Sequence, residues 1–434
     1  MRRTARKAIL IVIDGLTPRA FEAAVESGAA PALAALAREG EYRRSVSTFP
    51  SLTPVCLSTI ATGSHPDVHG IPHLVWWNRR ERRLVEYGSS FHALRAAGLT
   101  RGLRDTIFNL NQKHLSPDAV TIYEALEDAG LTAAAVNITC YRGRTRHLPI
   151  IPGVPHAFGP RRFFWYSLFE SDPTGAPIAV RNRATGSIDA YAACVGRWLV
   201  TRDGFDFLVY YLPDYDYASH AFGPDGCGPA LARSDAAVQA LIDAAGGLDE
   251  FLERYAVVLC ADHGQTLVER ADRLEDPLTG IEDVVVAASN RAGMVYDLRG
   301  GRARALAERL DGGGHLALFR EDGALVARRD GEEGLGLLDE YPQGRARAAA
   351  ALANPNAGEL IVSAAPGAEF VDLGGRHHLG GGSHGSLTAG DSLVPMLTVG
   401  LGEPPDSIAG IAPLVLRHFS VEPPSYGRAP AAAA

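Results

Sequence analysis

Aspartate and histidine side chains recur in four short segments of the sequence, three of which follow a predicted strand. The segments are IVIDG with Asp14, DYDYASH with Asp216 and His220, CADHG with Asp262 and His263, and GGSHGS with His384. Asp216 and His220 are four residues apart, so a helical turn places both on one face. Glycines around His384 let that loop approach a site closely. Three aspartates and three histidines are the oxygen and nitrogen ligands that suit two zinc ions with positions left for a substrate.

Each segment taken alone has a simpler explanation. An aspartate after a strand is usually a helix N-cap or a turn residue, and a single loop histidine is often only structural. All four segments together, in this order and mostly at strand ends, are hard to explain as caps. Two neighbouring metal ions stabilise both the attacking and the leaving oxygen of a phosphoryl displacement. The set therefore predicts a two-metal phosphohydrolase.

The elements that must position these residues are alternating strands and helices. Continuous apolar runs predict buried strands at 8–13, 132–137, 205–212 and 255–260, and periodic segments predict helices at 31–39 and 123–130. This alternation is typical of an α/β fold with a mostly parallel central sheet and helices on both faces. Such sheets bind ligands beyond the carboxyl ends of their strands, which is where three of the segments lie.

Changes in pattern along the chain predict a division into two parts. We expect a catalytic core formed by residues 1–284 and 376–434. An irregular insert at about 73–118 is expected near the active site. Short strands and turn signals at 285–375 predict a smaller α+β subdomain.

Composition narrows the class of protein. The 434 residues carry a net charge of −8 with acidic and basic residues mixed, which argues against binding of a nucleic-acid polymer. Five scattered cysteines without CxxC spacing argue against a disulfide framework and against a thiolate zinc site. The apolar run at 8–13 is too short for a signal peptide, and no run reaches the roughly 20 residues of a membrane span. A cytoplasmic location without membrane partners is the prediction.

The order of the motifs resembles the alkaline phosphatase superfamily, in particular its type I phosphodiesterase/nucleotide pyrophosphatase-like branch. The resemblance rests on IVIDG, then SLTPVCLSTIATGSHPDVHGI at 51–71, then the DxxxH, DHG and GxHG segments. These motifs run from residue 14 to 385, so the resemblance covers nearly the whole chain and implies an alkaline phosphatase-like core. It further implies two Zn²⁺ ions, for which Mn²⁺ or iron are alternatives. One would be held by Asp216, His220 and His384, and the other by Asp14, Asp262 and His263.

The resemblance also implies that Thr53 is the nucleophile and bridges towards the second zinc. Metal coordination activates a hydroxyl that is otherwise a poor nucleophile. Thr53 would take the phosphoryl group and a water molecule would remove it. Thr48, in the segment STFP, is a rival, but only Thr53 fits the family spacing to Thr62 and His69 without an insertion.

One position departs from the family pattern. An asparagine that usually follows HGI and holds a phosphate oxygen is replaced by Leu74. His73 or Asn78 could substitute for it. Arg142 and Arg144 are candidates for gripping a terminal phosphate, because arginine binds phosphate through two parallel hydrogen bonds. The alternative interpretation is that both arginines belong to a solvent-exposed loop and bind no substrate. Trp76 and Trp77 are candidates for stacking a base, or else packing groups.

The function predicted from these residues is hydrolysis of phosphodiester or pyrophosphate bonds in small, nucleotide-like or organic phosphorylated substrates. Three alternatives stay open. They are a phosphomonoesterase that uses the arginines, a phosphonate or sulfate hydrolase of the same superfamily, and an inactive metal-binding relative.

Overall fold

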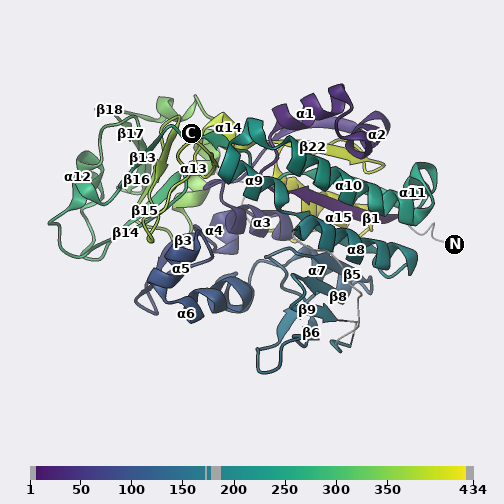
Figure 1. Cartoon of the computed structure of the whole chain (residues 1–434). Helices are drawn as coiled ribbons and strands as arrows, with labels where there is room; N and C mark the ends of the chain where they lie inside the picture. The colour runs from purple at the N-terminus through teal and green to yellow at the C-terminus, as the bar shows by residue number, and fades with distance from the viewer. Residues whose placement is uncertain (1–5, 172–173, 177–186, 427–434) are drawn as a thin grey trace.

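The computed structural model describes residues 6–171, 174–176 and 187–426. Within these residues the centre of the molecule is an eight-stranded sheet in the order β2-β22-β11-β1-β10-β5-β8-β9 (Figure 1). Its strands are β1 (Lys7–Ile13), β2 (Glu41–Val46), β5 (Ala133–Val136), β8 (Arg162–Trp165), β9 (Phe169–Ser171), β10 (Phe207–Leu212), β11 (Tyr255–Cys260) and β22 (Leu393–Val399). Strands β11, β1, β10, β5 and β8 run parallel, whereas β22 and β9 pair antiparallel with their neighbours. The predicted fold class is confirmed.

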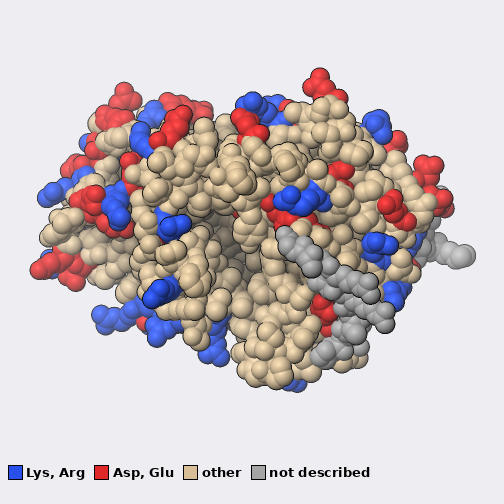
Figure 2. Space-filling model, viewed as in Figure 1, with Lys and Arg blue, Asp and Glu red and all other residues tan. Residues whose placement is uncertain are grey.

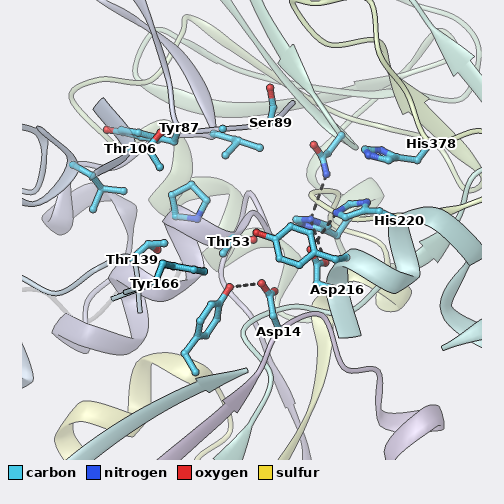
Figure 3. Close-up of a pocket in the computed structure, with 18 of the residues that line it drawn as sticks. Asp14, Thr53, Tyr87, Ser89, Thr106, Thr139, Tyr166, Asp216, His220 and His378 are labelled. Atoms are coloured by element: carbon cyan, nitrogen blue, oxygen red, sulfur yellow. Dashed lines mark hydrogen bonds and ion pairs between the residues drawn. The ribbon is translucent and has the colours of Figure 1, made fainter. Parts of the chain in front are cut away.

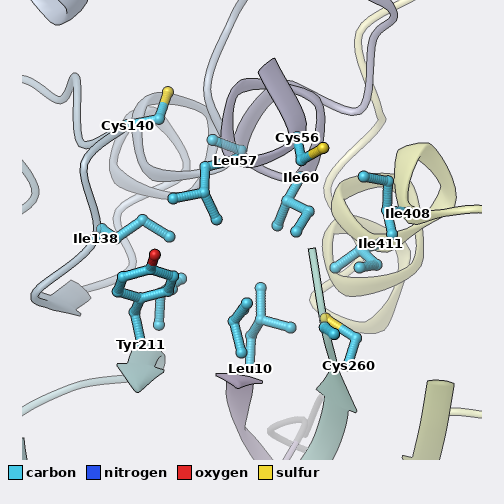
Figure 4. Packing of buried hydrophobic residues seen from close by; sticks show 14 of the residues in the cluster. Leu10, Cys56, Leu57, Ile60, Ile138, Cys140, Tyr211, Cys260, Ile408 and Ile411 are labelled. Atoms are coloured by element: carbon cyan, nitrogen blue, oxygen red, sulfur yellow. The ribbon is translucent and has the colours of Figure 1, made fainter. Parts of the chain in front are cut away.

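The central strands are apolar on both faces because helices cover both faces. Helices α8 (Ile188–Thr201) and α10 (Gly228–Ala245) cover one face, where the Tyr210 hydroxyl donates to the Ala237 carbonyl at 3.1 Å. Helices α3 (Thr53–Thr62) and α15 (Ile411–His418) cover the other. On that face Leu10, Tyr211 and Cys260 point towards the side chains of α3 and α15 (Figure 4). A strand covered on both faces reads as a continuous apolar run, which is why β1 and β11 are recognisable in the sequence.

A second sheet of six strands lies beside the first and has a small core of its own. It contains β14 (Val284–Ser289), β15 (Ala292–Asp297), β19 (Leu360–Ser363), β16 (Leu316–Glu321), β17 (Ala324–Arg329) and β18 (Glu332–Glu333), all antiparallel. Helices α12 (Ala303–Arg309) and α13 (Gly344–Leu352) pack against it (Figure 1). The sheet falls on the segment for which we predict an α+β subdomain, and the domain boundaries stay a prediction.

The insert at 73–118 is more regular than its composition indicates. It forms a hairpin of β3 (Val75–Asn78) and β4 (Arg83–Glu86), the helices α5 (Phe91–Ala97) and α6 (Leu99–Arg104), and the π-helical segment η1 (Asp105–His114). Arg83 on the hairpin pairs with the buried Asp105 carboxylate at 2.5 Å, so β4 and η1 are held together. Among the described residues, no helix combines the length and the apolar character needed to cross a lipid bilayer.

A buried ion pair ties the six-stranded sheet to the loop that carries His384. The Arg291 side chain, just before β15, is fully buried, and its Nε lies 2.8 Å from Asp391 Oδ2. The same carboxylate oxygen accepts from the Ser386 amide at 2.8 Å, and the Arg291 amide donates to the His384 carbonyl at 2.8 Å. Arg291 therefore fixes the backbone at His384 and, through Asp391, at Ser386.

Replacing Arg291 with leucine is expected to destabilise the protein strongly. The substitution leaves the Asp391 carboxylate buried without its cation, which costs roughly 3–5 kcal/mol. Urea unfolding measures the loss. The control is Arg299→Leu, whose partners Glu282 and Asp283 lie on the surface, and it should change stability little. Equal stabilities for the two variants would contradict a structural role for the buried pair.

Candidate metal centre and active site

The predicted aspartates and histidines meet at the carboxyl edge of the central sheet. Strand β1 lies between β10 and β11, so residues that follow these three strands are neighbours. Asp14 follows β1, and Asp262 and His263 follow β11. Helix α9 (Asp214–Phe222), which begins just after β10, carries Asp216 and His220 on one face. The topology therefore brings five of the six predicted ligands to one place.

The six residues form two groups, each compact enough to bind one ion. In the first group, His263 Nε2 lies 3.2 Å from Asp14 Oδ1 and 3.5 Å from Asp262 Oδ2. In the second, which Asp216, His220 and His384 form, the Nε2 atoms of His220 and His384 lie 3.3 and 3.9 Å from the Asp216 carboxylate. Within each group one ligand atom from every residue lies within 4.8 Å of the others. The His263 and His384 rings stack at 3.6 Å, so the two groups are adjacent.

Backbone carbonyls orient all three imidazoles in the same way. The Nδ1 atoms of His220, His263 and His384 lie 2.8, 3.0 and 2.8 Å from the carbonyl oxygens of Gly382, Gly264 and Ser51. A carbonyl only accepts, so each Nδ1 carries a hydrogen and each Nε2 is left to face the carboxylates. Outer hydrogen bonds of this kind fix the tautomer that binds a metal ion.

The electrostatics of the two groups indicate a missing positive charge. Burial raises the pKa of Asp14, and burial together with the Asp14 carboxylate raises the pKa of Asp262 well above its ordinary value. Burial by itself lowers the pKa of an imidazole, but Asp262 and Asp14 outweigh it at His263 and raise that pKa to about 10. At His384 burial and the neighbouring His263 prevail and lower the pKa. In the absence of a metal ion, a proton on His263 thus supplies the positive charge beside the carboxylates that a metal cation could supply instead.

Two buried carboxylate oxygens of the first group are suited to bind a metal ion. Asp14 Oδ1 and Asp262 Oδ2 are buried and receive no hydrogen bond. A buried carboxylate oxygen without a partner is costly. Both oxygens point into the first group, where oxygen and nitrogen ligands of the kind that zinc, manganese and iron accept converge.

Thr53 lies beside these groups, at the first residue of α3. Its Oγ1 is 3.1 Å from His263 Nε2, and the N-cap position belongs to Leu52, so the hydroxyl is not used as a cap. Pro54, the second residue of the helix, has no backbone N–H that needs a partner. Thr48 is placed differently. Its side chain is buried away from the cavity, and its carbonyl accepts from Arg347 at 2.9 Å.

A cavity of about 480 Å³ opens over Thr53 and the second group. The face in Figure 2 is hollowed at its centre, and the charged side chains lie mostly around the rim. Figure 3 shows Thr53, Asp14, Asp216 and His220 at one end, with Tyr87, Ser89 and Thr106 at a distance from them. Aromatic rings form much of the wall, namely Tyr87, Trp165, Tyr166, Tyr211 and Tyr217. Among the described residues, no lysine or arginine lines the cavity.

The four residues predicted to bind phosphate do not line the cavity. Their side chains contact other parts of the protein instead. Arg142 binds Glu124 at 3.1 Å and the carbonyls of residues 115, 116 and 119, and Arg144 binds Asp128 at 2.9 Å. Asn78 accepts from two amides of the β3–β4 turn. His73 is fully buried, and burial lowers its pKa to about 4. None of the four lines the cavity, whereas Leu74 does. The structure thus does not bring these four residues to the candidate site, and their contact with a substrate stays a prediction.

Several residues beside the two metal-ligand groups lie outside the motifs that the sequence analysis identifies. The Tyr211 hydroxyl donates to Asp14, and the Gln265 amide donates to Asp216. Tyr211 lies at the end of β10 and Gln265 lies shortly after β11. This position relative to a strand end is a signal by which sequence reasoning could have found both residues. Asn290 comes from a distant segment, whereas His378 lies six residues before His384, in a position where a histidine can orient a metal ligand. The His378 ring lies against the His220 ring in a tilted arrangement, with 4.2 Å between the ring centroids, and its Nδ1 lies 2.6 Å from the buried Glu369 carboxylate. Trp76 and Trp77 do not line the cavity.

The sequence matches the family described as type I phosphodiesterase / nucleotide pyrophosphatase over residues 8–387. The chain belongs to this family, which places it among hydrolases of phosphorylated compounds. No curated protein matches the sequence.

Solved structures share the fold over nearly the whole chain. Mouse ectonucleotide pyrophosphatase/phosphodiesterase 5 is 14% identical, with 98% of each chain covered and a TM-score of 0.67. An inactive form of that mouse protein, with threonine replaced by alanine, was solved in complex with AMP. Phosphonoacetate hydrolase from Sinorhizobium meliloti 1021, in complex with phosphonoformate, is 19% identical, with 96% of each chain covered and a TM-score of 0.64.

Replacing Asp262 with asparagine is expected to remove one metal ion and leave the other. The amide keeps the shape but supplies no charge to the first group, while the second group is unchanged. Bound metal, measured by mass spectrometry after desalting, should fall from about two to about one per chain. Asp322→Asn, in an exposed turn with the left-handed backbone that asparagine tolerates, is the control. Equal metal content in both variants would refute the assignment.

Proposed function

We propose that this chain is a two-metal phosphodiesterase that uses Thr53 as its nucleophile. The observation that carries the proposal is the position of the Thr53 hydroxyl. It faces the cavity at the N-terminus of α3 and lies 3.1 Å from an imidazole of the first metal-ligand group. Two divalent cations, held by Asp14, Asp262 and His263 and by Asp216, His220 and His384, would lower the pKa of that hydroxyl and neutralise the phosphoryl oxygens.

The chain's own residues account for the rest of the reaction. The N-terminus of α3 presents amide groups and a partial positive charge to the anionic phosphoryl group. Thr53 Oγ1 forms a bond to phosphorus as the bond to the leaving oxygen breaks, and the proton that Oγ1 loses is balanced by the proton that the leaving oxygen gains as it departs as an alcohol. Water then attacks the same phosphorus, releases the phosphoryl group as a monoester and restores the threonine.

The charge of the cavity favours a diester over a monoester. Three carboxylates and a threonine alkoxide offset the four positive charges of two divalent cations. No lysine or arginine among the described residues adds positive charge to the cavity wall. A phosphodiester brings one negative charge and a phosphomonoester about two, so the monoester lacks a cation to balance it. The aromatic wall supports an aryl or nucleoside substituent on the second ester oxygen.

A comparison of three chromogenic esters tests the substrate class. We expect bis-p-nitrophenyl phosphate and the p-nitrophenyl ester of thymidine 5′-monophosphate to be hydrolysed with kcat/KM at least about tenfold above that of p-nitrophenyl phosphate. The assay uses protein whose metal content has been measured. A preference for the monoester would contradict the charge argument. Absence of turnover with both ions bound would instead favour a phosphonate or sulfate substrate or an inactive protein.

Thr53→Ala is expected to abolish turnover without removing metal. Loss of a covalent nucleophile should lower kcat roughly a thousandfold or more, because the alanine methyl group cannot form a bond to phosphorus. Thr48→Ala is the matched control, since Thr48 is buried outside the cavity, and it should keep near-normal kcat. The reverse result would make Thr48 the nucleophile. Metal analysis of both variants excludes loss of the ions as the cause.

A further inference from the structure

Asn290 brings an amide group to the metal-ligand groups from the six-stranded sheet. It lies in the two-residue turn between β14 and β15, with a left-handed backbone at φ 56°, and it is buried. Its side chain lines the cavity, and Nδ2 lies 3.3 Å from His384 Nε2. No aspartate-histidine motif includes this residue.

The hydrogen bonds around Asn290 fix which end of the amide faces the site. The Ser289 hydroxyl donates to Asn290 Oδ1 at 2.8 Å, which turns the NH2 group towards His384. His384 Nδ1 donates to the Ser51 carbonyl at 2.8 Å, so its Nε2 presents a lone pair. The amide donates to that lone pair, which is the one a metal ion would use.

Metal binding at His384 would take the acceptor away from Asn290. The NH2 group is buried and would face the second metal-ligand group without a partner. A buried donor without an acceptor costs about 1–3 kcal/mol. An anionic oxygen held at the same cation would supply the acceptor, and a hydrogen bond to a charged oxygen is stronger than one between neutral groups.

The neighbouring segment that contains Leu74 supplies no side-chain hydrogen-bond donor from that residue. Leu74 lines the same cavity with an aliphatic side chain. The two segments are neighbours, because β3 packs against β14 and the His73 side chain contacts the Ala292 backbone. A phosphoryl oxygen beside Leu74 can therefore be reached by Asn290 but receives no hydrogen bond from the Leu74 side chain.

We propose that the Asn290 amide donates a hydrogen bond to a non-bridging phosphoryl oxygen of the substrate. This inference rests on the proposed phosphodiesterase function and adds a substrate-contacting residue to it. It assigns the donor to the turn of the six-stranded sheet rather than to the loop that contains Leu74. The six-stranded sheet thereby contributes directly to the active site.

Binding of orthovanadate to metal-loaded protein tests the inference separately from turnover. Asn290→Gly removes the amide and suits the left-handed backbone. Asn290→Asp keeps the shape and replaces the donor with a negative oxygen. Isothermal titration should show orthovanadate bound about 10- to 100-fold more weakly by Asn290→Gly, and at least as weakly by Asn290→Asp. Asp322→Gly, at another left-handed turn residue, controls for the backbone change and should bind like the wild type.

The outcomes separate the two proposals. Unchanged metal content and melting temperature with weakened orthovanadate binding support the inference. It is overturned if either Asn290 variant binds orthovanadate like the wild type, or if Asn290→Gly loses metal in proportion to its loss of binding. Wild-type protein that carries both ions but neither hydrolyses the esters nor binds orthovanadate would refute the phosphodiesterase function itself, and the role of Asn290 with it.

Discussion

Three carboxylates buried at one edge of the central sheet are the constraint on which the rest of the structure depends. Asp14, Asp216 and Asp262 are less than a tenth exposed and lie close enough to raise one another's energy. Uncompensated charges in such a place cost several kcal/mol each. Histidines, the Tyr211 hydroxyl and the Gln265 amide surround them, and two oxygens are still left without a donor. The arrangement is therefore one that a cation stabilises.

Both sheets contribute residues to this site. The parallel strands β1, β10 and β11 deliver five ligands because their carboxyl ends lie side by side. The sixth residue, His384, lies on a loop that the buried Arg291–Asp391 pair attaches to the six-stranded sheet. The cavity lies between these parts, and the turn with Asn290 and the insert with Leu74 both line it. Relative movement of the two sheets would change the distance between His384 and the other ligands.

The two ends of the cavity differ in the kind of side chain that lines them. One end holds the metal-ligand groups and Thr53, whereas aromatic and hydroxyl side chains from the insert and the central sheet form the remainder (Figure 3). The arginines that resemble a phosphate grip stabilise α7 (Ile122–Asp128) instead, through Glu124 and Asp128. No lysine or arginine is among the described wall residues, so in the proposed mechanism selectivity would depend on the overall charge of the metal ions and their ligands. Small changes in this wall would alter the substrate while leaving the metal centre intact.

The sequence by itself determined the fold class and the six residues that the structure groups around the candidate metal centre. Buried parallel strands read as apolar runs, and a functional aspartate directly after such a run is a local signal, as at Asp14 and Asp262. The tertiary structure alone decided which polar residues face the cavity. Arg142 and Arg144 are near the right motifs, but Glu124 and Asp128 hold them away from it. Asn290 lies 94 residues from His384, and only the packing of one sheet against the other brings their side chains to 3.3 Å. Local sequence fixes strand ends and helix faces, whereas the partner of a buried polar group is set by contacts between distant segments.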